Sequence, residues 1–233
     1  VERRLNPNSD LRVSWIRRDW RDLWDDRFLV TSQRSAENLP EAERWHEELR
    51  VLFQKRFADR WQMLASYTWS KTEGNLFANT GRSSFADLSD LTDTNLVNRF
   101  GPAPYDRPHQ IKIFAQVQEP LTWATVSIGN AVRFQSGTPY QQEFADGFGL
   151  RFLTPRGALR LENFWQWDLS AGLSWQWRSQ AELEAKLEVF NLTDEQAQLG
   201  VETRIEGGRF GLPRSIADLQ GPRQIRLTLG LRF

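Results

Sequence analysis

The chain has 233 residues, with 30 Lys and Arg against 30 Asp and Glu, so no net field attracts nucleic acid or an anionic membrane surface. It has no cysteine, which excludes disulfide scaffolds, thiol catalysis and thiolate metal sites. Its two histidines, His46 and His109, lie far apart in the sequence, which argues against a His-rich metal site. The 11 Trp beside only 3 Tyr are an unusual excess that a fold must explain.

The apolar residues are too scattered for a membrane helix. Apolar runs do not exceed three residues, as at 51–53 and 113–115, whereas a membrane helix needs about 20. The mean hydropathy of -0.59 is typical of a soluble protein. A strand of a membrane β-barrel, however, alternates apolar and polar residues over roughly 10 positions, so its mean hydropathy is also low. The hydropathy therefore excludes membrane helices and leaves membrane strands open.

Alternation of apolar and polar residues with a period of two runs through most of the chain and predicts β-strands. It begins at 1–5, 11–15 and 49–53 and continues through 61–70, 111–118, 125–133, 165–177, 181–189 and 225–233. Leu64 and Asn130 are exceptions. Segment 180–189 is rich in helix formers, but its alternation outweighs that propensity. We predict about eight strands and a short additional one at the start of the chain.

The connections between these strands alternate in length. Short ones lie at 6–10, 58–60, 119–123 and 178–180, and long ones at 25–45, 72–108, 141–163 and 192–222. Alternate connections of an antiparallel meander lie at the same end of the sheet, so all long loops share one end. Outer-membrane barrels sort their loops in this way. The sequence therefore predicts an all-β chain, an antiparallel up-and-down meander of about eight strands that forms part of a transmembrane β-barrel in a Gram-negative outer membrane.

Several tryptophans stand at the ends of the predicted strands. Tryptophan prefers the membrane–water interface, where its ring meets lipid and its N–H reaches polar groups. From Trp167 to Trp175 is about 26 Å along a strand, which fits a thin hydrocarbon layer of outer-membrane lipid. We expect two interfacial girdles formed by Trp61, Trp69, Trp165, Trp167, Trp175 and Trp177.

Five segments are similar to sequence motifs of a known family. They are Ser-Tyr-Thr-Trp-Ser-Lys at 66–71, Asp-Arg-Pro-His at 106–109, Gln-Ser-Gly-Thr-Pro-Tyr at 135–140, Phe-Asn-Leu-Thr-Asp at 190–194 and the terminal strand at 223–233. In order and spacing they resemble the C-terminal part of the β-barrel of TonB-dependent outer-membrane receptors. Among the types of this family, the five motifs resemble most the Oar-like, or carboxypeptidase-regulatory-domain, type.

The resemblance implies a receptor and transporter for active uptake of an unidentified ligand. Residues 1–233 would be the C-terminal segment of its barrel, without the plug domain and the N-terminal strands. Phe233 would be the assembly signal read by the barrel assembly machinery, and the TonB system would be a partner of the full-length protein. Under this hypothesis Arg133, Asp168 and Arg226 face the lumen and line the ligand path.

Two other architectures fit the same alternation. One is a soluble β-sandwich whose long loops bind a ligand, and the other is a small, self-closed barrel of eight strands. The charged face argues against the small barrel, whose interior has room only for its own side chains. The sandwich would require the row from Trp165 to Leu173 to pack against a second sheet.

No residues predict an enzyme, a cofactor, a metal site or a nucleic-acid partner. No nucleophile–base pair is recognisable, so we expect no catalytic residues. Asp25 and Asp26 are adjacent, and Asp87, Asp90 and Asp93 are spaced by threes, which is not the alternate spacing of a calcium loop. Solvated loop faces explain these carboxylates better than calcium binding.

Overall fold

The computed structural model describes residues 1–30, 33–77, 97–146, 149–178 and 181–232. For residues 24–30, 33–37, 39, 41, 145–146, 149–150 and 177–178 only the backbone is described. In the described ranges no helix is long and apolar enough to cross a membrane. Phe233 lies outside the described residues, and the Trp177 side chain does as well.

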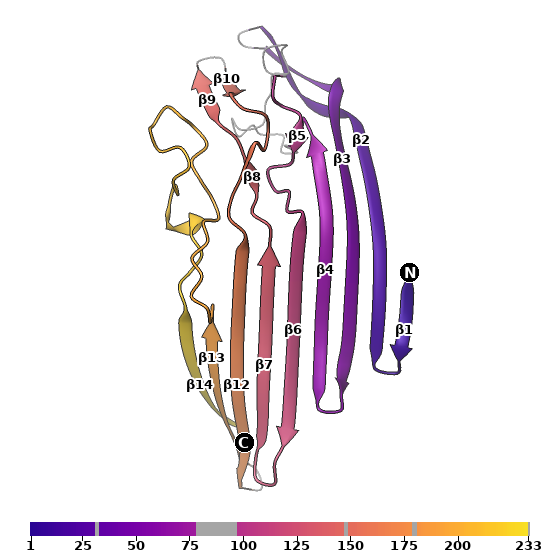
Figure 1. The fold of residues 1–233 in the computed structure, drawn as a ribbon, viewed down its shortest axis with the longest axis vertical. Coiled ribbons are helices and arrows are strands. Elements are labelled where there is room, and N and C mark those ends of the chain that lie inside the picture. Colours follow the sequence, from indigo (N-terminus) through magenta and orange to yellow (C-terminus); the bar gives the residue numbers. More distant parts are fainter. Residues whose placement is uncertain (31–32, 78–96, 147–148, 179–180, 233) are drawn as a thin grey trace.

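One large antiparallel sheet makes up most of the molecule (Figure 1). The strands follow the chain order β1-β2-β3-β4-β6-β7-β12-β13-β14, so the sheet is the predicted meander. Its long strands are β2 (Ser9–Val30), β3 (Gln33–Ala58), β4 (Trp61–Gly74), β6 (His109–Pro120), β7 (Thr125–Gln135), β12 (Phe164–Arg178), β13 (Ala181–Phe190) and β14 (Gln224–Arg232). The short β1 (Glu2–Asn6) extends the sheet beyond β2, and β5 (Gly101–Pro102) pairs with β4. The prediction of about eight strands and a short first one is confirmed.

The tight turns lie at one end of the sheet and the longer connections at the other (Figure 1). The long connections contain two small hairpins, β8 (Pro139–Tyr140) with β11 (Leu159–Arg160) and β9 (Glu143–Asp146) with β10 (Gly149–Phe152), and the 3-10 helix η1 (Ile216–Asp218). The predicted sorting of connections by length is therefore confirmed. We call these two ends the turn end and the loop end.

One predicted loop is different in the structure. Residues 25–45 were expected to connect two strands, but β2 and β3 continue through most of this segment as one long hairpin. Pairing within the hairpin satisfies backbone hydrogen bonds without requiring apolar side chains, which is why alternation did not indicate it. A register shift after Arg21, next to Asp22 with a φ of 51°, marks a bulge at which the hairpin bends.

The sheet is open, and this excludes both alternative architectures. In the part of the chain that the structure describes, β1 and β14 are the two edges and do not pair with each other, so the small self-closed barrel is wrong. The row from Trp165 to Trp175 is exposed or half-buried throughout, and neither small sheet covers it. A sandwich would bury this row, so the soluble sandwich is wrong as well.

The pairing register joins the apolar positions of successive strands into one continuous face. One row of this face reads Val117, Ile128, Ala171, Leu187 and Leu227. We call this surface the apolar face and the opposite one the polar face. On β14 the apolar face is bare: Leu229 is 74% exposed. Soluble monomers seldom leave so large a contiguous apolar surface in water.

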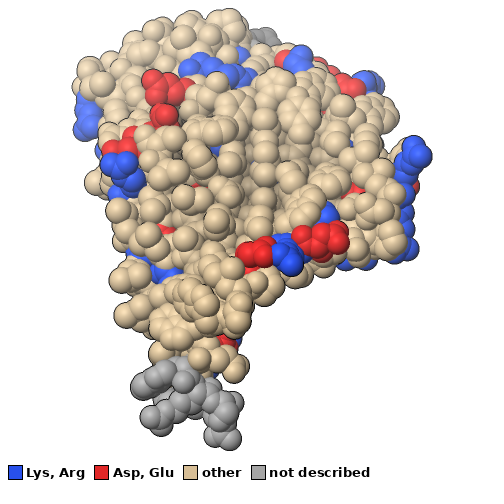
Figure 2. All heavy atoms as spheres, turned by 60° about the horizontal axis from the view of Figure 1, so that its bottom comes forward, with Lys and Arg blue, Asp and Glu red and all other residues tan. Residues whose placement is uncertain are grey.

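Charged side chains lie beyond the ends of the apolar face. On β3 its positions from Leu49 to Phe53 lie between Glu47 and Lys55, and on β6 the row from Ile111 to Val117 is followed by Glu119. Figure 2 shows a broad uncharged area with Lys, Arg, Asp and Glu gathered mainly along its margins. The charges are therefore sorted into bands, as a hydrocarbon layer between two aqueous phases requires.

The exceptions to the alternation have structural explanations. Asn130 lies on the apolar face, where its Oδ1 accepts a hydrogen bond from Trp167 Nε1 at 3.1 Å, so this amide oxygen is not left unpaired. Leu64 and Phe114 are register partners and lie side by side on the polar face, 45% and 48% exposed. They form a small apolar island among polar residues.

Candidate functional site

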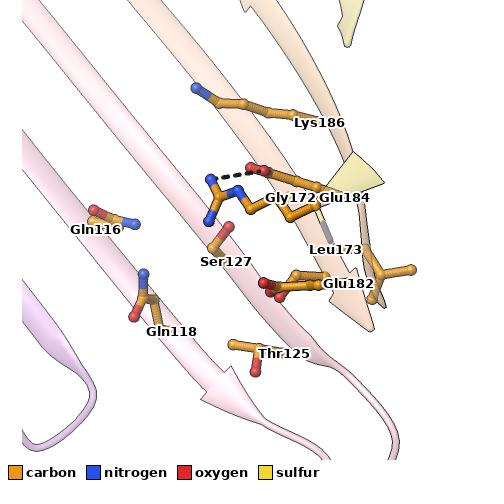
Figure 3. Close-up of a pocket in the computed structure, with 11 residues that line it drawn as sticks. Gln116, Gln118, Thr125, Ser127, Gly172, Leu173, Glu182, Glu184 and Lys186 are labelled. Carbon is orange, nitrogen blue, oxygen red and sulfur yellow. Dashed lines mark hydrogen bonds and ion pairs between the residues drawn. The ribbon is translucent and has the colours of Figure 1, made fainter. Parts of the chain in front are cut away.

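The polar face is concave, and side chains of five consecutive strands of the sheet surround a cavity there. The cavity has a volume of about 270 Å³ and is lined by residues of β6, β7, β12, β13 and β14. Figure 3 shows Gln116, Ser127 and Glu184 extending into this space, whereas Leu173 extends to the other side of the sheet. The walls are mostly amides, hydroxyls and carboxylates, so the cavity fits water and polar solutes rather than lipid.

Glu188 is the centre of an ion-pair network next to this cavity. Its Oε2 accepts from Arg226 Nε at 2.7 Å, and its Oε1 lies 2.9 Å from Lys186 Nζ. The Glu188 side chain is only 11% exposed, so its two cationic partners provide the hydrogen bonds that water would otherwise supply. The register of β13 and β14 places Arg226 beside Glu188, whereas Lys186 lies two residues before it on the same strand.

The three residues predicted to line the ligand path lie on this face but not in one cluster. Arg133 Nη2 is 3.5 Å from Asp168 Oδ2, which joins β7 to β12. Asp168 Oδ1 also accepts from Gln166 Nε2 and from the backbone N–H of Asn191. Arg226 pairs separately with Glu188 on β13. These contacts make Asp168 a junction between a strand and the loop that follows β13.

Five of the six predicted girdle tryptophans lie on the apolar side of the sheet, near the two ends of their strands. Trp69, Trp165 and Trp167 lie toward the loop end, and Trp61 and Trp175 toward the turn end. Trp177 lies on β12, with its side chain outside the described residues. Trp15 was missed: it is 60% exposed beside Leu49, and its Nε1 donates to Glu47 Oε1 at 3.1 Å.

The Asp-Arg-Pro-His segment ties the long loops to the sheet. Asp106 is 3% exposed, and its Oδ1 accepts from the Thr72 backbone N–H at 2.9 Å. Its Oδ2 accepts from Arg160 Nη2 at 3.1 Å, while Arg160 Nη1 donates to the Gly137 carbonyl at 2.7 Å. One carboxylate thus connects β4 with the β8–β11 hairpin.

At the Gln-Ser-Gly-Thr-Pro-Tyr segment, two segments of the chain cross at close range. The Ser136 Oγ accepts from the His109 backbone N–H at 3.1 Å. Gly137 donates its N–H to Asn163 Oδ1, and a Cβ at this glycine would lie 1.9 Å from the Leu161 carbonyl oxygen. Only glycine fits at this crossing, which explains its place in the motif.

The Phe-Asn-Leu-Thr-Asp segment closes the loop between β13 and β14. Asn191 is 2% exposed and has a φ of 51°, a conformation that asparagine adopts more readily than most residues. Its Nδ2 donates to the carbonyls of Glu195 and Gly221, and its Oδ1 accepts from the Glu195 N–H. The Asp194 Oδ1 accepts from the N–H of Arg223, the residue before β14. These motifs are therefore structural clasps at strand exits.

The described residues contain no group of three or more side chains able to hold a metal ion. The predicted loop carboxylates Asp87, Asp90 and Asp93 lie outside the described residues, as do the side chains of Asp25 and Asp26. The functional elements that the structure offers are therefore the two faces and the clasped loops.

No family model matches the chain. The TonB-dependent transporter Oar of Myxococcus xanthus is 34% identical to it over an alignment of 178 residues that covers 72% of this chain. The outer-membrane transporter YddB of Escherichia coli superposes on 99% of the chain with a TM-score of 0.61 at 13% identity. The chain is a part of a TonB-dependent receptor barrel.

Other solved receptors share this fold. BauA, the ferric preacinetobactin receptor of Acinetobacter baumannii, matches all of the chain with a TM-score of 0.60 at 14% identity. The ferric-catecholate import receptor Fiu of E. coli matches 98% with a TM-score of 0.55 at 17% identity. At this identity they show the fold of the TonB-dependent receptor barrel, and they carry no ligand assignment to this chain.

The TonB-dependent receptor relatives are much longer than the chain. It spans 16% of the length of the Oar transporter and 26%, 28% and 31% of Fiu, BauA and YddB. These relatives are transporters and receptors, and barrels of this family reside in the outer membrane, which confirms the predicted localisation.

Proposed function

We propose that residues 1–233 form the C-terminal wall segment of a TonB-dependent receptor that actively takes up a ligand through the outer membrane. The observation that carries this proposal is the two-sided sheet: one face is continuous and apolar, and the other is concave and polar. In this arrangement the apolar face contacts lipid, and Arg133, Asp168 and Arg226 line the lumen. The tryptophans would lie at the two membrane–water interfaces.

The same proposal assigns the partners. The TonB system would energise transport in the full-length protein, and the barrel assembly machinery would read the terminal strand with Phe233. The similarity to the Oar transporter supports the first of these assignments. The relatives are transporters and receptors, so the proposed role is transport.

Uptake can be tested while the ligand is still unidentified. Cells with and without the receptor that carries this chain would be grown in one medium, and depletion of its components would be followed by mass spectrometry. We expect at least one component whose depletion needs both the receptor and the proton gradient, because an energised partner drives transport in this family. Depletion that persists after an uncoupler, or no receptor-dependent depletion, would contradict active uptake.

The orientation of the two faces gives a second prediction. The chain has no cysteine, so single cysteines are clean probes. Leu229→Cys and Thr228→Cys are neighbours on β14 that point to opposite faces. In outer-membrane vesicles a small, membrane-impermeant maleimide should label position 228 at least tenfold faster than position 229, because a lipid-buried thiol seldom ionises.

Labelling in urea provides the control, since both thiols should then react at equal rates. Faster labelling of position 229 than of position 228 in the intact vesicles would reverse the assignment of the faces.

A further inference from the structure

A second cavity lies at the loop end of the polar face. It has a volume of about 350 Å³ and is lined by residues of β2, β3 and β4 and of the segment that precedes β6. Arg18, Arg44 and Arg107 contribute to its walls. None of the motifs described above includes Arg18 or Arg44, and the ion pairs of Glu188 and Asp168 lie elsewhere on the sheet.

The carboxylates of this cavity have cationic neighbours or N–H donors, although Glu48 Oε1 is buried without a hydrogen bond. Glu48, whose side chain is 13% exposed, lies 2.8 Å from Arg50 Nη2 and 3.7 Å from His46 Nε2. Asp106 is held by the Thr72 N–H and by Arg160. The acidic groups at the cavity therefore have cationic or N–H partners other than its three lining arginines.

The arginines, in contrast, are left without carboxylate partners among the described residues. Arg18 is exposed and makes no hydrogen bond or ion pair there. The Arg44 guanidinium lies 4.5 Å from the centre of the Trp20 ring, and its Nε is buried with no acceptor. Arg107 donates only to the Ser136 carbonyl, and burial lowers the pKa of its guanidinium.

Among the described residues Arg44 Nε is a buried donor without an acceptor, which makes this cavity costly when it is empty. The cost falls if an anion supplies acceptors, because charge-assisted hydrogen bonds to arginine are among the strongest in proteins. Planar guanidinium groups match the oxygens of carboxylates and phosphates. Tyr105, which is 56% exposed at the same cavity, adds a hydroxyl donor beside them.

We propose that this cavity binds an oxyanion group, a carboxylate or a phosphate, of a small ligand that enters from the loop end. The proposal rests on the transport function proposed above and adds the chemical class of the ligand. The cavity lies on the polar face, away from the lipid, so the anion is a soluble molecule and not a lipid headgroup. Arg18 and Arg44 are its specificity-determining residues.

The test is equilibrium binding to the receptor that carries this chain, in outer-membrane vesicles at low salt. Radiolabelled citrate serves as the carboxylate probe and radiolabelled pyrophosphate as the phosphate probe. We expect saturable binding of at least one probe, weakened about tenfold or more by Arg18→Gln and by Arg44→Gln. Arg18 is exposed, so its variant removes the charge without disturbing the packing of the sheet.

Arg56→Gln is the matched control, because Arg56 is on the same strand and face as Arg44 but lies near the turn end beside Asp10 at 3.1 Å. This control should bind the probe like the unaltered receptor. Failure of both probes to bind overturns the anion site, and so does binding by the Arg18→Gln and Arg44→Gln variants that is as tight as binding by the unaltered receptor.

Binding needs no energy source, so it separates this proposal from the proposed function. Anion binding without gradient-dependent uptake would overturn transport and leave the site standing. Uptake without binding of either probe would overturn the site alone.

Discussion

Replacement of Ala171 by arginine should weaken insertion of the receptor into the membrane by about 2–4 kcal/mol. Ala171 lies near the middle of β12, exposed on the apolar face, between Ile128 and Leu187 of the neighbouring strands. A guanidinium at this depth must either lose its water or distort the bilayer around it. The change therefore acts on the transfer into lipid and not on strand pairing, because the backbone ladder is unchanged.

The matched control for this substitution is Gln118→Arg. Gln118 lies in the adjacent register row, which continues through Ser127, Gly172 and Lys186 on the polar face. There a new guanidinium would meet water and the carboxylates of the first cavity. Insertion would be followed by urea titration of the receptor in liposomes of defined thickness. An equal loss of insertion free energy in the Ala171→Arg and Gln118→Arg variants would mean that the face carrying Ala171 is not in lipid.

Asn191→Ala should destabilise the clasp of the β13–β14 loop by about 3–5 kcal/mol. The substitution removes three hydrogen bonds, each worth about 0.5–1.5 kcal/mol. Alanine in the left-handed conformation of this position costs roughly 1–2 kcal/mol more. The loop amides that the clasp protects, such as that of Gln220, should therefore exchange hydrogen much faster.

Asn191→Gly separates the two contributions. Glycine loses the same side-chain hydrogen bonds but adopts a positive φ without strain, so its variant should be more stable than the alanine variant by about 1 kcal/mol. Amide hydrogen exchange at the turn end of β12 and β13 should stay unchanged in both variants. Unaltered exchange at Gln220 in the alanine variant would show that Asn191 does not hold the loop.

The arginine cavity and the clasps differ in what they contribute. Asp106 and Asn191 use their side-chain polar atoms on hydrogen bonds beside strand ends, so they restrain the loop end. Arg18 and Arg44 lie on the same sheet and hold nothing of this kind among the described residues. A rigid frame with unsatisfied donors inside it is the arrangement that selective binding needs.

Much of this molecule was predictable because its information is local. The alternation from Trp165 to Trp177 determines a strand and its two faces without any partner, since successive side chains of a strand point in opposite directions. The alternating lengths of the connections determine which strand ends share a side of the sheet. Even the helix-prone segment that became β13 was predictable, because burial of one face outweighs propensity.

The remaining features depend on which residues the register brings together. Trp167 donates a hydrogen bond to Asn130, which is 37 positions away in the sequence. Arg160 donates one to Asp106, which is 54 positions away. The cavity of Arg18 and Arg44 exists only because β2, β3 and β4 pair as they do. The length of the β2–β3 hairpin had no signal in the alternation of apolar and polar residues. Composition and periodicity report what each strand presents to its surroundings. The tertiary structure alone decides which charges and donors of the polar face find partners, because those partners come from other strands.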